Sequence, residues 1–281
     1  MSRIPGLLKA LEFNEQSLPL VMGILNVTPD SFSDGGKFSQ YETMRSQIEL
    51  MIESGVDIID VGGESTRPGA DPVPLNEEID RVLPAIELIR SLSDKAISVD
   101  TYKPEVMKAA IDLDVDMIND VNALQSNGAL DVVAGANVPV CLMHKKGQPF
   151  DMQQAPYYDD VVTDVTDFLI NRAEACEQAG LKSDYIFLDP GFGFGKTLKH
   201  NIALFQNMEQ LTQLNYSLLV GVSRKRMIGS LAGIEADLSL EQRLCGSVSA
   251  AVVAAHKGAK IIRVHDVAET VQALRVAAAL W

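Results

Sequence analysis

The sequence predicts a (β/α)8 barrel, and two observations support this fold class. Eight short apolar runs recur along the chain, and amphipathic segments of helical period separate most of them. The runs are rich in Val, Ile and Leu without clean alternation, as is typical of strands buried on both faces of a parallel sheet. A chain of 281 residues also suits a single barrel domain, which commonly has about 250 residues. A doubly wound sheet is the alternative, but it rarely contains so many units without a second domain.

The expected elements follow one another in a regular order. The expected strands are 20–25, 56–61, 96–100, 115–120, 138–143, 184–189, 217–222 and 259–264. The expected helices are 41–55, 76–92, 103–113, 160–180, 202–214, 239–258 and 267–280. Residues 1–18 are predicted to form an N-terminal extension before the first strand, within one domain that spans 1–281.

Composition excludes several classes of function. The formal net charge of −14 argues against nucleic-acid binding, which usually requires a basic face. No apolar run approaches the roughly 20 residues that a membrane span needs, and the first residues contain no signal-peptide core. The three cysteines form no C-x-x-C pair, so we expect buried, reduced thiols in a cytoplasmic protein.

Nearly every expected strand ends in a polar residue. In a (β/α)8 barrel the carboxyl ends of the strands meet at one mouth, where the chemistry takes place. These strand ends contain Asn26, Glu64, Asp100, Asn119, His144, Asp189, Lys225 and Arg263. We therefore expect most of these side chains to converge, and we interpret Asp266 with Glu269 as a helix cap instead.

The acceptors among these residues suit one of two ligands. Asp100, Asn119 and Asp189 match a flat heterocycle with adjacent N–H groups, such as a 2-amino-4-oxo-pyrimidine, because a carboxylate accepts two parallel hydrogen bonds. The same oxygens could instead hold a divalent metal.

A second group is cationic, and it indicates an anionic ligand. Its members are Arg67, Lys225, Arg226, Arg263 and His265. Four of them follow the last two strands, where barrels often bind phosphate. Two long loops, 26–40 and 62–75, are candidate lids. Their acidic residues, Asp30, Asp34 and Glu64, could stabilise a developing cation, hold Mg²⁺ or simply form turns.

The stretch "DPGFGFGKT", residues 189–197, looks like a nucleotide-binding loop but fits neither common motif. A phosphate-binding loop needs G-x-x-x-x-G-K-[ST], and residue 190 is proline. The dinucleotide motif G-x-G-x-x-G fails because residue 196 is lysine. We expect a strand-to-helix connection that does not hold a nucleotide.

Seven motifs in chain order resemble those of the dihydropteroate synthase family. They are "GILNVTPDSFSDGG", "IIDVGGESTRPG", "ISVDTYKPEV", "INDVNAL", "LDPGFGFGKT", "VGVSRKRMIG" and "RVHDV". The resemblance runs from about residue 20 to the C-terminus. It implies a homodimeric (β/α)8 barrel that joins 6-hydroxymethyl-7,8-dihydropterin diphosphate to p-aminobenzoate with Mg²⁺, as part of folate synthesis.

The resemblance also implies roles for individual residues. The implied pterin-binding residues are Thr66, Asp100, Asn119, Asp189, Lys225 and Arg263. The implied diphosphate-binding residues are Asn26, Arg67, Arg263 and His265, and Asn26 also binds Mg²⁺. The implied p-aminobenzoate pocket contains Phe32, Pro68 and Phe194, and Arg226 either meets the substrate carboxylate or points to solvent. The implied catalytic residues are Lys225, Arg263 and Asp34, the last of them near a pterin cation formed in an SN1-like step.

Two other functions are alternatives to this interpretation. A methyltetrahydrofolate-dependent corrinoid methyltransferase shares the Asp/Asn/Asp set but needs no diphosphate site, and a non-catalytic pterin-binding barrel is the third candidate. We expect His144 to be structural and Lys145 and Lys146 to be solvated. The alanine-rich helical segments 247–257 and 271–280 are our expected dimer interface.

Overall fold

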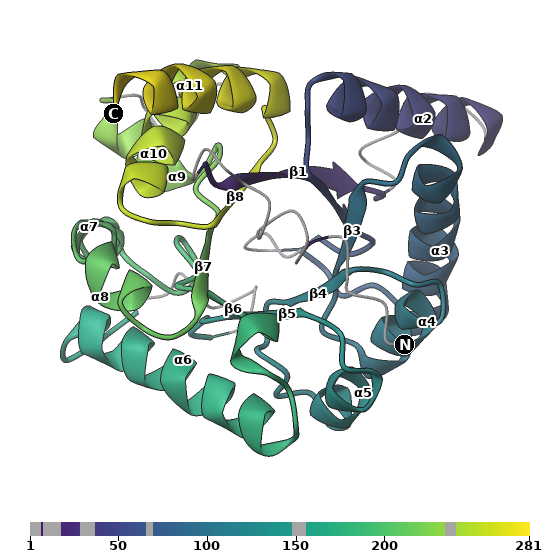
Figure 1. Cartoon of the computed structure of the whole chain (residues 1–281), viewed down its shortest axis with the longest axis horizontal. Helices are drawn as coiled ribbons and strands as arrows, with labels where there is room; N and C mark the ends of the chain where they lie inside the picture. The colour runs from purple at the N-terminus through teal and green to yellow at the C-terminus, as the bar shows by residue number, and fades with distance from the viewer. Residues whose placement is uncertain (1–6, 8–17, 29–36, 66–69, 148–155, 234–239) are drawn as a thin grey trace.

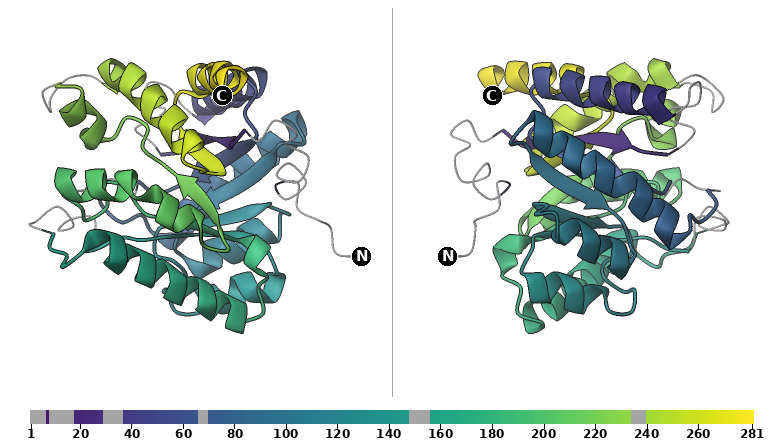
Figure 2. Two further views of the ribbon diagram at one scale, coloured as in Figure 1. Left: turned by 60° about the vertical axis from the view of Figure 1, so that its left-hand side comes forward. Right: turned by 90° about the vertical axis from the view of Figure 1, so that its right-hand side faces the viewer.

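A computed structural model describes residue 7 and residues 18–28, 37–65, 70–147, 156–233 and 240–281. Its eight parallel strands close into one barrel in chain order, so the predicted fold class is confirmed. The strands are β1 Leu20–Asn26, β2 Ile58–Gly62, β3 Ala96–Asp100, β4 Met117–Asp120, β5 Val140–Met143, β6 Ile186–Asp189, β7 Ser217–Val220 and β8 Ile261–Val264. In Figure 1 the helices surround this ring, and Figure 2 shows them along the outside of the strands.

The helices follow the strands in chain order. The long ones are α2 Lys37–Glu53, α3 Leu75–Leu92, α4 Pro104–Ile111, α5 Ala129–Ala136, α6 Val161–Gln178, α7 Leu198–Gln206, α10 Leu244–His256 and α11 Val267–Leu280. The short ones are α8 Met208–Thr212 and α9 Arg226–Leu231, with 3-10 turns η2 Ser183–Tyr185 and η3 Leu240–Arg243.

Three helical regions differ from the prediction. Helices α5 and α9 were not expected, and the six residues of α9 give too little periodicity to recognise. The expected helix 202–214 is two helices, α7 and α8, that meet at Asn207, where the side-chain amide donates to the Ala203 carbonyl.

The inner face of the barrel changes from apolar to polar along β2, β3, β4, β6 and β8. Its lower layer consists of Leu20, Met22, Ile58, Ala96, Met117, Cys141, Phe187, Leu219 and Ile261, joined by Leu7. Because side chains alternate between the two faces of a strand, positions two residues further on also face inward. Those positions include Asp60, Ser98, Asn119, Asp189 and Arg263. The strands therefore place an apolar floor beneath a polar mouth.

Leu7 belongs to the expected N-terminal extension, and its side chain is fully buried in the barrel floor. The rest of 1–17 lies outside the described residues, and the division of the chain into domains stays a prediction.

The cysteine prediction is partly wrong. Cys141 and Cys176 are buried and unpaired, whereas Cys245, on α10 beside the groove toward α11, is exposed. Among the described helices, none is long and apolar enough to cross a membrane.

Candidate active site at the barrel mouth

An ion-pair network spans the barrel between β8, β2 and β3. The guanidinium of Arg263 donates from Nε to Asp60 Oδ2 and from Nη2 to Asp100 Oδ2, both at 2.7 Å. Asn119 Nδ2 lies 3.3 Å from the same Asp60 oxygen. Three predicted site residues, Asp100, Asn119 and Arg263, are therefore brought together. Arg263 is not an isolated anion-binding cation, since two carboxylates already balance its charge.

The strand register explains why these side chains meet. Asn26, Gly62, Asp100 and Asn119 pair in sequence across β1 to β4, so they lie at one height of the barrel. Gly62 leaves room beside its neighbours: a Cβ placed there would be 3.8 Å from Asn26 Oδ1 and 3.8 Å from Asp100 Cβ.

Sequence reasoning missed Asp60, which lies inside β2 and is fully buried. The search for site residues considered only the ends of the strands, and Asp60 stands within an apolar run. The signal was present, since a carboxylate inside such a run is rarely buried without a partner.

Several buried acceptors here lack a hydrogen-bond partner among the described residues. They are Asp60 Oδ1, Asp100 Oδ1 and Ser98 Oγ, and Ser98 pairs in register with Asp60. An unsatisfied buried polar atom costs about 1–3 kcal/mol, so this wall is suited to a ligand that supplies N–H groups. Burial raises the pKa of Asp100 to about 7, Arg263 opposes the rise, and Asp60 adds to it.

On the opposite side of the mouth, Asp189 and Lys225 lie near enough for their charges to affect each other. Burial raises the pKa of Asp189, and Lys225 works against that rise. Lys225 is the half-buried N-cap residue of α9, and desolvation lowers its pKa to about 8. Its Nζ donates to the Phe192 carbonyl and lies 4.7 Å from the centre of the Phe194 ring. Asp189, Lys225 and Phe194 are therefore also brought together.

The ends of β7 and β8 are tied by short-range contacts. The backbone N–H of His265 donates to Ser223 Oγ at 3.2 Å, and its Nδ1 lies 3.2 Å from the same oxygen. Arg226 is exposed at the start of α9.

The predicted cap is confirmed in position, since Asp266 is the N-cap residue of α11 and Glu269 lies in its first turn. The side chain of Asp266 makes no capping bond, however, and instead accepts from Arg224, with an Nε–Oδ2 distance of 3.0 Å.

Glu64 is held by protein partners. It forms an ion pair with Lys103 and accepts from the Tyr102 hydroxyl at 2.8 Å. Lys103 also pairs with the buried Glu78 and donates to the Val73 carbonyl at 2.6 Å. Glu64 thus anchors the base of the second loop, and the structure favours that role over metal binding.

The residues that follow β5 match the prediction in part. His144 is buried against Lys196, as expected of a structural histidine, and burial lowers its pKa to about 2. Lys146 is exposed, but Lys145 is half-buried beside Tyr102.

Five predicted site residues lie outside the described residues. They are Phe32, Asp34, Thr66, Arg67 and Pro68. Their roles stay predictions.

Asn26 is the candidate ligand for a metal. It is half-buried at the end of β1, and its amide oxygen is a hard donor. Among the described residues there is no group of three or more His, Cys, Asp or Glu that could hold an ion. Mg²⁺ keeps several waters and often binds through substrate phosphates. Asn26 therefore fits an ion held mainly by a diphosphate and does not fit a protein cage.

Comparison with known proteins gives consistent results. A family model described as "Pterin binding enzyme" matches residues 22–265. The chain is 48% identical over 260 residues to the dihydropteroate synthase of Haemophilus influenzae, which covers 92% of this chain and 93% of the relative. It is 50% identical over 260 residues to that of Escherichia coli K12, with 92% and 91% covered.

Solved structures agree. The chain is similar to a Xanthomonas albilineans dihydropteroate synthase with 4-aminobenzoic acid, at 49% identity, a TM-score of 0.88 and 94% coverage of both chains. A second structure from that organism, in complex with 7,8-dihydropteroate, gives 46% identity, a TM-score of 0.85 and 94% coverage of both chains.

Proposed function

The chain belongs to the pterin-binding enzyme family, and we propose that, as a dihydropteroate synthase, it joins 6-hydroxymethyl-7,8-dihydropterin diphosphate to p-aminobenzoate. The products are 7,8-dihydropteroate and diphosphate. The proposal rests above all on the buried acceptors of the mouth. A pterin carries the 2-amino-pyrimidinone edge whose N–H groups these acceptors lack.

Asp60, Asp100, Asn119 and Ser98 form the wall that would receive this edge. Asp189 would accept from the pterin on the other side, while Arg263 lies between the two walls and Lys225 beside Asp189. The unpaired oxygens of Asp60 and Asp100 support this assignment, because ligand N–H groups would satisfy them. Thr66 joins the pterin site if the second loop reaches it.

The diphosphate would lie above this wall, near Asn26, Arg67, Arg263 and His265. Mg²⁺, bound by Asn26 and the diphosphate, would supply positive charge to the leaving group. His265 and the loop arginine would orient the phosphates from the β8 and β2 sides.

The reaction breaks the C–O bond between the pterin methylene carbon and the diphosphate, and the electron pair leaves with the diphosphate. The electron-rich dihydropterin stabilises the resulting cation, so the step is SN1-like, and Asp34 would lie near that charge. The amine of p-aminobenzoate then attacks the carbon and loses a proton to solvent. This amine is already neutral near pH 7, so no side chain is required as a strong base.

Phe194, together with Phe32 and Pro68, would wall the p-aminobenzoate pocket, with Lys225 at its base. The exposed Arg226 would meet the substrate carboxylate from the start of α9. The relative bound to 4-aminobenzoic acid, at 49% identity, supports a pocket of this kind.

A coupled assay tests the function. Purified protein, Mg²⁺ and both substrates should release diphosphate and form dihydropteroate in equal amounts. Asp100→Ala should abolish both signals, while Asp131→Ala, at an exposed position on α5, should leave them unchanged. Pterin binding without any release would contradict the proposal and favour a methyltransferase or a non-catalytic barrel.

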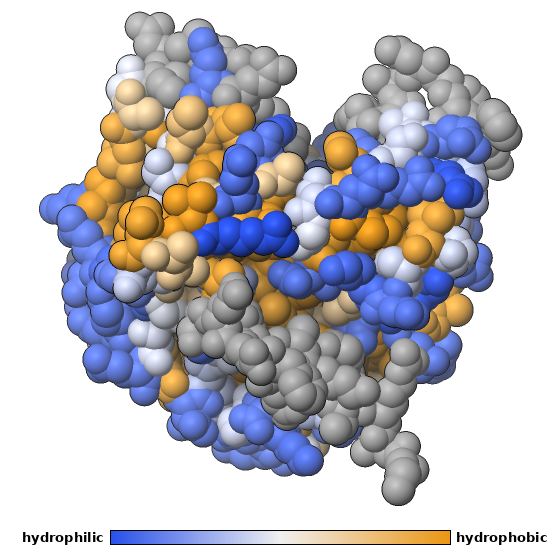
Figure 3. Space-filling model, turned by 45° about the horizontal axis from the view of Figure 1, so that its top comes forward, coloured by the Kyte–Doolittle hydropathy of each residue, from blue (hydrophilic) through white to orange (hydrophobic). Residues whose placement is uncertain are grey.

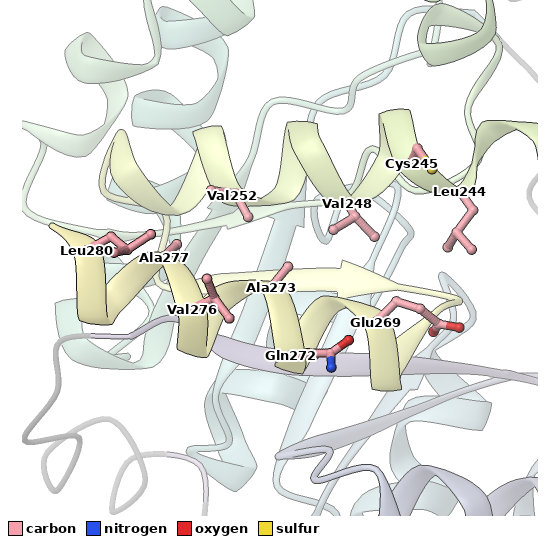
Figure 4. Close-up of a pocket in the computed structure, with 10 residues that line it drawn as sticks. All are labelled: Leu244, Cys245, Val248, Val252, Glu269, Gln272, Ala273, Val276, Ala277 and Leu280. Atoms are coloured by element: carbon pink, nitrogen blue, oxygen red, sulfur yellow. The ribbon is translucent and has the colours of Figure 1, made fainter.

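We further propose that the enzyme is a homodimer joined through α10 and α11. An apolar groove runs between these helices and includes Val248, Val252, Ala273 and Val276. Figure 4 shows the groove, with the two valines of α10 pointing toward α11, and Figure 3 shows hydrophobic surface on this face. Exposed residues continue the surface, and they are Val253, Val276, Leu280 and Trp281. A second copy would cover them.

The dimer has a direct test. Val276→Glu should shift the protein from twice the chain mass to the chain mass in sedimentation at micromolar concentration. Leu50→Glu places the same charge at an exposed leucine on α2 and should leave the dimer intact. A monomeric wild type would contradict the proposal.

A cytoplasmic location is also proposed. All three cysteines are unpaired, which supports a reducing compartment.

A further inference from the structure

The loop after β6, residues 190–197, lies against the backbone of the segment after β5. Gly191 and Gly195 have φ of +66° and +64°. A Cβ at Gly191 would stand 1.9 Å from the His144 carbonyl oxygen, and one at Gly195 would stand 2.1 Å from the Lys146 carbonyl oxygen. No side chain fits at either position, so the two segments touch through their main chains.

Lys196 folds back into this contact, and only 2% of its surface is exposed. Its Nζ lies 2.9 Å from the Gly191 carbonyl, 3.1 Å from the Phe194 carbonyl and 2.8 Å from His144 Nδ1. The His144 carbonyl is a fourth acceptor at 3.3 Å. None of these four acceptors is a carboxylate, and burial lowers the pKa of Lys196 well below its usual range. Lys196, which resembles a phosphate-binding lysine in sequence, thus forms hydrogen bonds within its own loop.

Two other side chains hold the loop from outside. Asn201 Oδ1 accepts from the Gly193 N–H at 2.8 Å, and its Nδ2 donates to the Thr197 carbonyl at 2.8 Å. The Tyr158 hydroxyl donates to the Gly195 carbonyl at 2.8 Å. These contacts hold Gly193, Gly195 and Thr197, whereas Lys196 holds the carbonyls of Gly191 and Phe194.

The part of the loop that Lys196 holds contains one site residue, Phe194, and contacts two others, Asp189 and Lys225. The Gly191 N–H donates to Asp189 Oδ1 at 2.7 Å. The Phe192 carbonyl accepts from Lys225, and the Phe194 ring lies under the same ammonium. Residues 191–194 form a turn that is closed by a hydrogen bond from the Phe194 N–H to the Gly191 carbonyl. The carbonyls of Gly191 and Phe194, at its two ends, both accept from Lys196.

We propose that Lys196 is a positioning residue for the second substrate, p-aminobenzoate. By holding the carbonyls at both ends of the turn 191–194, it fixes the position of the Phe194 ring and that of the Lys225 ammonium beside the pocket. Lys196 itself touches neither substrate. This inference rests on the proposed function, because it requires Phe194 to wall the p-aminobenzoate pocket.

His144 helps to hold Lys196 in place, because its Nδ1 lies 2.8 Å from the lysine Nζ. Its Nδ1 accepts from Lys196 only while the ring is neutral, and burial and Lys196 hold the pKa of His144 at about 2. The ring also packs edge-on against Phe168, with centroids 4.9 Å apart. Burial therefore favours the neutral ring, the form in which a nitrogen of His144 can accept from Lys196.

Steady-state kinetics separates positioning from simple stability. Lys196→Met keeps the length of the side chain but donates no hydrogen bond. It should raise KM for p-aminobenzoate by about tenfold or more, and KM for the dihydropterin diphosphate by less than about threefold. Phe194→Ala should give the same split, which is a large rise in KM for p-aminobenzoate with a small rise in KM for the dihydropterin diphosphate. Lys199→Met, at an exposed lysine three residues further on, is the matched control and should change neither constant.

A second pair of variants covers the case in which Lys196→Met does not fold. His144→Asn keeps an acceptor near the position of Nδ1, and His144→Leu removes it. The asparagine variant should keep the wild-type KM for p-aminobenzoate within about threefold, while the leucine variant should reproduce the split.

Two outcomes would overturn the inference. One is an equal rise of both KM values, and the other is a lower melting temperature with both KM values unchanged. A wild type that forms no dihydropteroate would instead refute the proposed function. An active wild type whose variants lack the split would refute the role of Lys196 alone.

Discussion

The two walls of the mouth are held in different ways. On the β2, β3 and β8 side, side chains bind side chains: Arg263 joins Asp60 and Asp100 through bonds of 2.7 Å. On the β6 and β7 side, side chains bind the main chain of a glycine-rich loop, as Lys225 does at Phe192. Regular strands fix the first wall, whereas one buried lysine and two crowded glycines fix the second. We infer that both walls bind the pterin and that the second wall also positions the second substrate.

The largest effect should come from breaking the first wall. Arg263→Met leaves two buried carboxylates without their partner, and breaking such a pair costs about 3–5 kcal/mol. Urea unfolding should show a loss of this order, and calorimetry should show that pterin binding is lost. Arg45→Met removes an exposed ion pair on α2 and should cost less than about 1 kcal/mol. Equal losses in both variants would contradict the comparison.

The second wall should break at its glycines. Gly191→Ala should destabilise the protein by about 2–4 kcal/mol, because the new methyl group collides with the His144 carbonyl. Gly128→Ala is the matched control: its φ is +84°, but a Cβ there meets nothing within 4 Å. It should cost only about 1 kcal/mol. If Gly191→Ala cost no more than the control in thermal unfolding, the close contact would not hold the loop.

The two walls should also titrate at opposite ends of the pH profile. Asp100, with its pKa raised to about 7, loses the charged acceptor below that pH, and Lys225, with its pKa lowered to about 8, loses its charge above that pH. We expect kcat/KM to peak between these values and to fall about tenfold per unit outside them. Lys225→Arg should remove the alkaline limb, since arginine stays protonated. An unchanged alkaline limb would contradict this assignment.

The free energy of unfolding should also depend on pH through Asp100 and Lys225, and both shifted pKa values lower it between pH 7 and pH 8, where activity peaks. A raised carboxyl pKa means that the folded state holds a proton that the unfolded state has lost. Asp100 therefore favours unfolding increasingly from about pH 4 to pH 7. A lowered lysine pKa means the reverse, so the contribution of Lys225 to stability recovers from about pH 8 to pH 10. Urea midpoints of Asp100→Asn and Lys225→Met across pH measure the two contributions.

The smallest effect should come from Asp60→Asn. The amide keeps the shape of the side chain and removes a charge that raises the pKa of Asp100. The acid limb should move to lower pH, and pterin binding at pH 8 should weaken by about tenfold or less. Asp116→Asn, whose carboxylate pairs with Arg90 outside the mouth, should leave the acid limb in place. If the acid limb did not move in Asp60→Asn, the charge of Asp60 would not influence the pKa of Asp100 as expected.

The barrel was predictable because strands buried on both faces leave continuous apolar runs. The polar strand ends were predictable for the same reason, since Asp100 and Asn119 interrupt those runs at their carboxyl ends. The pairing of Arg263 with Asp60 was not, because partners 203 residues apart leave no local pattern. The pairing of Arg224 with Asp266, 42 residues apart, was not predicted for the same reason. The role of Lys196 depends on a backbone contact that no sequence motif encodes.

The barrel floor has a consequence for the order in which the chain can fold. Leu7 shares its layer with Ile261, and β1 closes on β8 through the pairing of Leu20 with Ile261. The first described side chain is thus enclosed only after the last strand has been synthesised and has docked. Contacts between distant parts of a sequence slow folding. A nascent chain that leaves the ribosome therefore keeps the apolar floor of its barrel exposed until β8 has been synthesised and has joined β1.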